Sequence, residues 1–210
     1  MMTLTTDQKQ ILMQQIAAHL PDFEYRAPVD GRQPRLVGPK GMAIYINCSD
    51  HRGKLHIHGE WPMDGHKYMS PRSWCVVPYG QDQDISINVS IERAPDAIAR
   101  EIMRRFLGPY RDLYEKCLTR KAEHDAYRNR AHATACHLAT VAGLPSPGIG
   151  EDQTQYTLHI GNVTTRGWYG DARCNADSVD LKLQSLSPEI AAQVLQLVYA
   201  ATLKTEATAA

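Results

Sequence analysis

Apolar residues recur at helical spacing in three stretches of the chain. The first stretch covers about residues 6–20 and stops at Pro21. The second begins at Pro95, because proline is favoured in the first turn of a helix, and the third begins at Pro188. The pattern therefore predicts helices near the start, in the middle and at the end of the sequence.

Between these stretches, apolar and polar residues alternate with the period of two that is typical of a half-buried strand. The clearest case is the run from Ile85 to Ile91, in which every second residue is Ile or Val. In the first half we expect strands at 35–37, 42–48, 55–60, 74–77 and 85–91, and in the second half at 156–160, 163–169 and 179–183. Short strands with turns between them favour antiparallel sheets.

The middle helical stretch raises a question of length. Gly108-Pro109 is expected to end one helix and restart another, which would run over 110–142 to Gly143. A single helix of that length would measure about 50 Å, more than the diameter of a small domain. It would have to protrude, bridge two units or break into a hairpin, and the sequence leaves these three possibilities open. Residues 144–152 read as a linker.

The two halves of the chain resemble each other. Arg72-Ser73-Trp74 and Arg166-Gly167-Trp168 lie 94 residues apart, and the alternating strands at Ile85 and Val179 have the same offset. Chance similarity between ordinary strand-to-helix turns is the alternative. The prediction is an α+β fold of two related halves, each a small antiparallel sheet of three or more strands covered by helices in the order α-β-β-β-α. The expected boundaries are 1–108 for the first half, 109–143 for a helical connector, 144–152 for a linker, 153–204 for the second half and 205–210 for a frayed tail.

Composition and charge narrow the function. The chain has 210 residues with 23 basic and 23 acidic side chains and a pI near 7.1, which excludes a uniformly basic nucleic-acid coat. A hydrophobic content of 43% excludes a disordered tail protein. The neutrality is a cancellation, because residues 93–142 carry 10 basic and 6 acidic side chains while residues 143–210 carry 4 and 7.

The five cysteines are odd in number and include no CxxC pair, which argues against a disulfide framework and a zinc ribbon. We expect free thiols and a cytoplasmic protein. The N-terminal residues lack the basic and apolar regions of a signal peptide, and no apolar run is long enough to span a membrane.

The basic middle region supplies the first candidate site. Arginines with interleaved tyrosines suit contacts with phosphates and bases, or with an acidic protein surface. A solvated helix face held by pairs such as Asp96–Arg100 is the alternative. The residues expected to contact a nucleic acid or a partner here are Arg100, Arg104, Arg111, Arg120 and Lys121.

The repeated Arg-x-Trp pairs supply the second candidate. An arginine beside a tryptophan on a strand can stack a base or anchor a protein partner. Tryptophans that merely repeat because the core repeats are the alternative. The residues concerned are Arg72, Trp74, Arg166 and Trp168.

A third candidate is a metal site. His56, His58 and Glu60 alternate on one strand and therefore share a face, and His66 could return to them after a turn. Two imidazoles and a carboxylate suit a divalent transition metal, although a polar, solvent-facing side of the strand explains the same pattern. His132 and Cys136, four residues apart on a helix, could supply half of another site.

Two resemblances bear on function. The order helix–three strands–helix is similar to the double-stranded-RNA-binding domain, but Arg93-Ala94-Pro95-Asp96 replaces that family's lysine cluster. The segments RLVGPKGMAIYI, LHIHGEWP and ISINVSIERAPDAIAREIMRRFLGPY resemble uncharacterised accessory proteins of bacterial phages, plasmids and integrative elements. That resemblance implies either the handling of nucleic acid or the blocking of a host defence complex.

We therefore expect a binding protein rather than an enzyme, with no cofactor. Its expected partner is a nucleic acid or a nucleoprotein complex, contacted through the basic helices. The alternatives are a protein-directed, anti-CRISPR-like inhibitor that acts as a homodimer, and a metal-dependent enzyme that uses the histidine-bearing strand.

Overall fold

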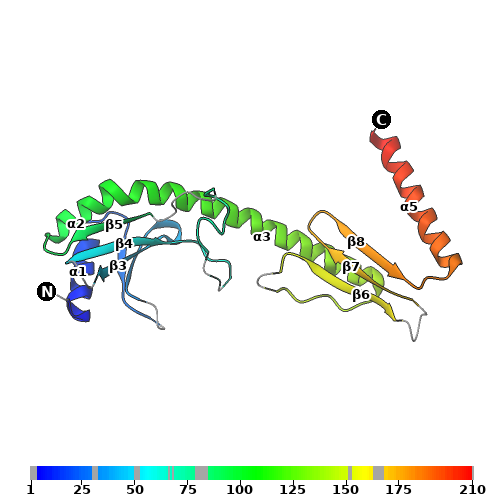
Figure 1. Cartoon of the computed structure of the whole chain (residues 1–210), viewed down its shortest axis with the longest axis horizontal. Helices are drawn as coiled ribbons and strands as arrows, with labels where there is room; N and C mark the ends of the chain where they lie inside the picture. The colour runs from blue at the N-terminus through cyan, green and yellow to red at the C-terminus, as the bar shows by residue number, and fades with distance from the viewer. Residues whose placement is uncertain are drawn as a thin grey trace. The chain divides into compact units, whose positions relative to one another are not determined.

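The protein consists of two compact units, Met1–His124 and Asp125–Ala210, and the boundary falls inside the long helix α3 (Gly108–Ala142) (Figure 1). The boundary lies within the region expected as a helical connector. The computed structural model describes residues 4–29, 33–49, 53–65, 67, 69–78, 85–150, 153–162 and 168–209.

The first unit contains a five-stranded antiparallel sheet in which the strands follow one another in chain order. Its strands are β1 (Glu24–Arg26), β2 (Arg35–Val37), β3 (Ala43–Ser49), β4 (Lys54–Glu60) and β5 (Ser86–Ser90), and the short helix η1 (Pro39–Gly41) joins β2 to β3. The expected strands at 35–37, 42–48, 55–60 and 85–91 are confirmed. The strand expected at 74–77 is wrong, because this segment forms hydrogen-bonded turns. Strand β1 was not expected, because it lies in a segment rich in turn-forming residues.

The helices of the first unit begin at two local signals in the sequence, the Thr-x-x-Gln capping pattern of residues 5–8 and the proline at position 95. In α1 (Thr6–Ala17), Thr5 and Gln8 form a capping box in which each side chain accepts a hydrogen bond from the other's backbone N–H. Pro95 opens α2 (Pro95–Glu101), which passes through a π-helical segment, η2 (Ile102–Leu107), into α3. The stop expected at Gly108 is wrong, since this glycine has a right-handed helical φ of −59°. The helix α3 is continuous and is followed by Gly143 at a φ of +67°.

The core of the first unit forms between one face of the sheet and the helices. Met13 and Ile16 of α1, together with Ile98, Phe106 and Tyr110 of the later helices, are fully buried against it. The Tyr110 ring lies directly over Gly59, where a Cβ would collide with it, and its hydroxyl donates to the backbone oxygens of Ala43 and Glu60. This packing leaves the opposite face of the sheet as a separate surface.

The second unit is smaller. The strands β6 (Tyr156–Asn162), β7 (Trp168–Cys174) and β8 (Val179–Gln184) form an antiparallel sheet, followed by α5 (Pro188–Ala209) (Figure 1). Three alanines of α3 at four-residue spacing, Ala131, Ala135 and Ala139, pack against Tyr156 and its neighbours. Residues 205–209, expected as a frayed tail, continue α5. Within the part of the chain that the structure describes, no helix meets the length and hydropathy needed to cross a membrane.

The structure does not confirm the internal duplication. The strands at Ile85 and Val179 correspond to β5 and β8, and the shared Leu-His-Ile at 55–57 and 158–160 would match β4 with β6. However, β4 and β5 are neighbours, whereas β7 separates β6 from β8. The Trp74 position also lies in a turn, while Trp168 begins β7. What is established is an α+β protein with two antiparallel sheets of different size and one long central helix.

Candidate functional site

The face of the five-stranded sheet that points away from the helices carries polar and aromatic side chains. In the register of β3, β4 and β5, Tyr45 lies opposite His58, and Asn47 lies opposite His56, which in turn lies opposite Asn88. Strand β4 alternates between buried residues and half-buried His56, His58 and Glu60, so these three share a face as the sequence predicts. We call the surface formed by Arg35, Tyr45, Asn47, His56, His58, Glu60 and Asn88 the open sheet face.

Three rings on the open sheet face form a stacked array. The centroids of Tyr45 and His58 are 5.5 Å apart with an interplanar angle of 21°, and those of His58 and His56 are 5.3 Å apart at 29°. Offset stacking at such separations is a favourable arrangement of aromatic rings. The array therefore holds three aromatic rings in a row on one side of the sheet.

Hydrogen bonds and an ion pair fix the ends of this array. The Tyr45 hydroxyl donates to Glu60 Oε2 at 3.4 Å and accepts from Arg35 Nη1 at the same distance, while the Arg35 and Glu60 charges lie 3.6 Å apart. At the other end, His56 Nδ1 lies 3.3 Å from Asn88 Oδ1. The Arg35 guanidinium thus offsets the one carboxylate in the array, and the rings are held before any ligand arrives.

A concave region borders the rings. An open pocket of about 370 Å³ is lined by Tyr45, Asn47, His58 and Glu60 together with Gln33 and Met63. Its volume lies at the lower end of the range of small-ligand sites. Lys9 donates to Asn47 Oδ1 at 3.3 Å, which brings a further positive charge to this surface.

Known proteins supply no guide to this surface. Neither a protein-family model, nor a curated protein, nor a solved structure matches the chain.

The three residues expected to bind a metal on β4 are instead engaged in stacking and in the Arg35 ion pair. Their ligand atoms do not converge within 4.8 Å, and in the described ranges the trio that does so is Asp64, His124 and Asp125. His66, expected to complete the site, lies outside the described residues. A metal bound by His56, His58 and Glu60 stays a prediction.

Arg100, Arg104 and Arg120 of the basic helices are exposed and lie beside carboxylates. Arg100 pairs with Asp96 at 3.0 Å, Arg104 with Glu101 at 2.9 Å, and Arg120 with Glu123 at 2.8 Å. Arg111 lies 3.8 Å from Asp22, and Lys121 is also engaged. Exposed pairs of this kind contribute little to stability, so the side chains could exchange their partners for phosphates. The helical contact surface stays a prediction, with its charge largely balanced locally.

The repeated Arg-x-Trp pairs have unequal surroundings. Trp74 is 5% exposed and donates from Nε1 to the backbone oxygen of Pro62 at 3.0 Å, so its ring belongs to the core. Trp168 is half-buried at the start of β7. Arg72 has an interaction partner, and Arg166 lies outside the described residues.

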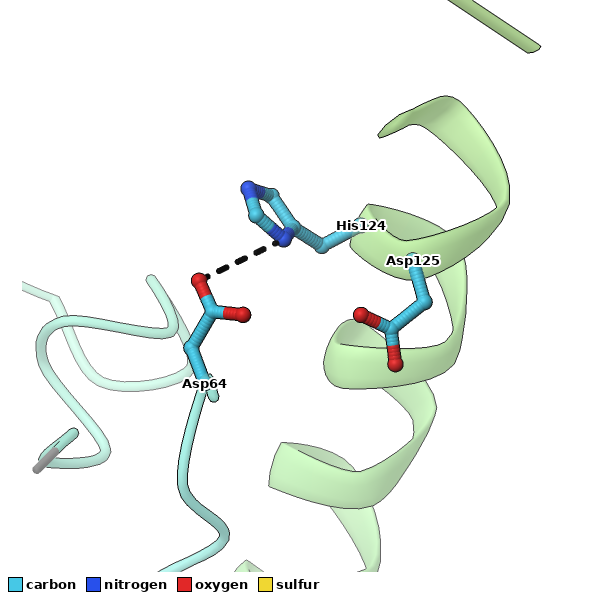
Figure 2. Close-up of side chains that lie close together, drawn as sticks. All are labelled: Asp64, His124 and Asp125. Carbon is cyan, nitrogen blue, oxygen red and sulfur yellow. Dashed lines mark ion pairs between the residues drawn. The ribbon is translucent and has the colours of Figure 1, made fainter. Parts of the chain in front are cut away.

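Sequence reasoning missed the Asp64–His124 contact (Figure 2). Asp64 follows β4 in a turn where Asp64 and Lys67 exchange backbone hydrogen bonds, and its side chain is buried. Nothing in the spacing of 60 residues between Asp64 and His124 indicates that the two side chains meet. The one indication in the sequence is Asp64 itself, a carboxylate among apolar and turn-forming residues.

The two buried cysteines, Cys117 and Cys174, offer little nucleophilic chemistry. Burial raises the pKa of the Cys117 thiol to about 11, and it also raises the pKa of Cys174. Cys136 Sγ lies 3.4 Å from His132 Nε2, as the four-residue spacing predicts, but that nitrogen also lies 3.0 Å from the Pro147 carbonyl oxygen. If Nε2 donates to Pro147, the nitrogen left to accept the thiol proton is Nδ1, which lies farther from Cys136 Sγ, at 3.9 Å.

Proposed function

We propose that this protein binds single-stranded nucleic acid on the open sheet face. The observation that carries the proposal is the stacked array of Tyr45, His58 and His56 on a face that the helices leave uncovered. Aromatic side chains on a sheet stack the bases of single strands in several unrelated folds, because every base has a π face. Base stacking and not strong positive charge would then supply most of the affinity.

The polar residues around the rings suit the rest of a nucleotide. The amides of Asn47 and Asn88 flank His56 and can both donate to and accept from base edges. Arg35 and Lys9 provide positive charge next to the rings. Handling of nucleic acid is also one of the two roles that the resemblance of the first half implies.

We therefore propose the nucleic-acid contact on the open sheet face and not on the basic helices, where the sequence predicts it. In the helices, Arg100 and Arg104 have carboxylates within 3.0 Å that a phosphate would have to displace, whereas the open sheet face carries aromatic rings on which a base could stack. A duplex presents few unstacked bases, so we expect single strands to bind better than duplexes of the same sequence.

Fluorescence anisotropy with labelled single-stranded RNA and DNA of mixed sequence tests the proposal. We expect saturable binding that Tyr45→Ala weakens between about fivefold and a hundredfold, since one stacked base is worth about 1–3 kcal/mol. Tyr45→Phe keeps the ring and should retain most of the affinity. Comparison of the RNA and DNA strands shows whether a 2′-hydroxyl contributes.

Arg104→Ala is the matched control, because it removes a predicted contact residue on an exposed helix without touching the sheet. We expect it to leave the affinity almost unchanged. Absence of binding to any single strand would overturn the proposal. A loss with Arg104→Ala but not with Tyr45→Ala would also overturn it, in favour of the helical surface.

A further inference from the structure

The second candidate site lies where the segment after β4 meets α3. Asp64 has a relative exposure of 5% and is the one buried charged residue among those described. Asp64 and His124 both belong to the first unit, and Asp125 is the next residue of α3.

The three side chains converge. One ligand atom from each of Asp64, His124 and Asp125 lies within 4.8 Å of the others. Figure 2 shows the Asp64 carboxylate facing the His124 ring, with the Asp125 carboxylate on the side of α3 nearest to Asp64. These atoms therefore surround one small volume.

Asp64 and His124 lie at an ion-pair distance that is longer than a hydrogen bond. Asp64 Oδ2 lies 3.7 Å from His124 Nδ1, beyond the usual 2.7–3.2 Å of an N–H···O bond, and Nδ1 is buried without a hydrogen-bond partner. Two ligands bonded at about 2.0–2.2 Å to one tetrahedral ion lie roughly 3.3–3.6 Å apart. The observed separation is thus close to that of two ligands of the same ion.

Two neighbouring side chains affect the site: Trp74 orients the His124 imidazole, and Arg128 would compete with a metal ion for the Asp125 carboxylate. The Trp74 ring meets the His124 ring edge-on with centroids 6.0 Å apart, and Trp74 is itself fixed by its bond to Pro62. Asp125 Oδ1 accepts a hydrogen bond from Arg128 Nη2 at 2.9 Å. An arriving cation would have to displace or share this guanidinium.

We propose that Asp64, His124 and Asp125 bind a divalent transition-metal ion. Two carboxylates and a neutral imidazole carry two negative charges, which match such a cation. The mixed nitrogen and oxygen donors without a thiolate suit Zn²⁺ or Mn²⁺ better than a soft ion such as Cu⁺. Three protein ligands would leave a further coordination position for water or a phosphate oxygen.

Isothermal titration of the full chain with ZnCl₂ and MnCl₂, after chelator treatment, tests this proposal. We expect one ion per chain for at least one of the two metals. His124→Ala and Asp125→Asn should each weaken its affinity about tenfold or more. Arg128→Gln should tighten binding, because it removes the group that competes for Asp125.

His159→Ala is the control, since His159 Nδ1 also lies near an aspartate, Asp171, at 2.6 Å but is exposed, and among the described residues no third ligand atom converges on this pair. It should leave binding unchanged. Circular dichroism confirms that each variant folds, and if Asp64→Asn fails to fold, His124→Ala and Asp125→Asn still decide the question.

Absence of saturable uptake of both metals would overturn the proposal, as would uptake that His124→Ala and Asp125→Asn leave unchanged. Neither result bears on the open sheet face. Tyr45→Ala should not alter metal affinity, so the failure of one proposal is distinguishable from the failure of the other.

Discussion

The cores of the two units consist of different kinds of side chain. In the first unit, a five-stranded sheet and its helices bury large side chains such as Phe106, Tyr110 and Ile57. In the second, the contact between α3 and the sheet is made mostly by alanines, with Tyr156 as the largest buried member. Since apolar burial is the main favourable term in folding, we expect the first unit to be considerably more stable than the second.

The exposed apolar residues reinforce this difference. In the second unit, Leu181 of β8 is 55% exposed and Leu197 of α5 is 72% exposed. The second unit therefore leaves exposed large apolar side chains of the kind that the first unit buries in its core. The two units differ in the apolar side chains that they bury, so the length of each unit does not by itself predict its stability.

The largest expected effect tests the core of the first unit. Tyr110→Ala removes a fully buried ring and its hydroxyl contacts, and should lower the free energy of unfolding of this unit by about 3–5 kcal/mol. Urea unfolding followed by the fluorescence of Trp61 and Trp74 measures it. Tyr169→Ala, at an exposed position of the second unit, should leave this transition in place.

A smaller effect tests the alanine packing of the second unit. Ala135→Leu inserts a larger side chain at a fully buried position and should cost about 1–3 kcal/mol. Hydrogen exchange of the β6 and β7 peptides, measured by mass spectrometry, should accelerate while that of β3 and β4 does not. If Ala126→Leu, on the exposed side of α3, had the same effect, the packing described for Ala135 would be refuted.

Substitutions at exposed apolar positions should hardly change the free energy of unfolding. Leu197→Ser should change the free energy of unfolding by no more than about 0.5 kcal/mol, because the leucine buries little surface. Thermal unfolding of the variant beside wild type measures this. A clear destabilisation would mean that α5 packs against something in solution.

The smallest effect concerns surface charge in the first unit. Arg104, aided by Arg105 and Arg93, holds the pKa of Glu101 below its ordinary value. A lowered carboxyl pKa stabilises the fold at neutral pH, and this contribution is lost as the pH falls below about 4. Glu101→Gln should therefore flatten the acid side of the stability profile slightly. An unchanged profile would show that these exposed pairs contribute nothing.

Much of the fold of the first unit is predictable from the sequence, because its strands alternate cleanly and its helices carry local signals. Thr5 with Gln8 marked α1, and Pro95 marked α2. The errors arose where tertiary packing overrides local preference. Gly108 continues a helix because the residues on both sides of it, Phe106 and Tyr110, are anchored in the core.

The candidate sites were less predictable. Alternation placed His56, His58 and Glu60 on one face, but nothing local indicated that Tyr45 would stack on His58, which depends on strand register. The contact between Asp64 and His124 depends on how a loop returns to a helix. The apparent duplication illustrates the reverse case, in which similar local sequences are paired differently in the two sheets.

The continuity of α3 has a consequence for the order in which the chain folds during synthesis. The buried core of the first unit ends with Cys117, so this unit can fold while the ribosome is still adding residues. The alanine face of α3 must then wait for β6, β7 and β8, an interval of several seconds at about 5–20 residues per second. We expect the already folded first unit to hold the start of α3 helical during that interval, so the second unit would assemble on a helix that has already been nucleated.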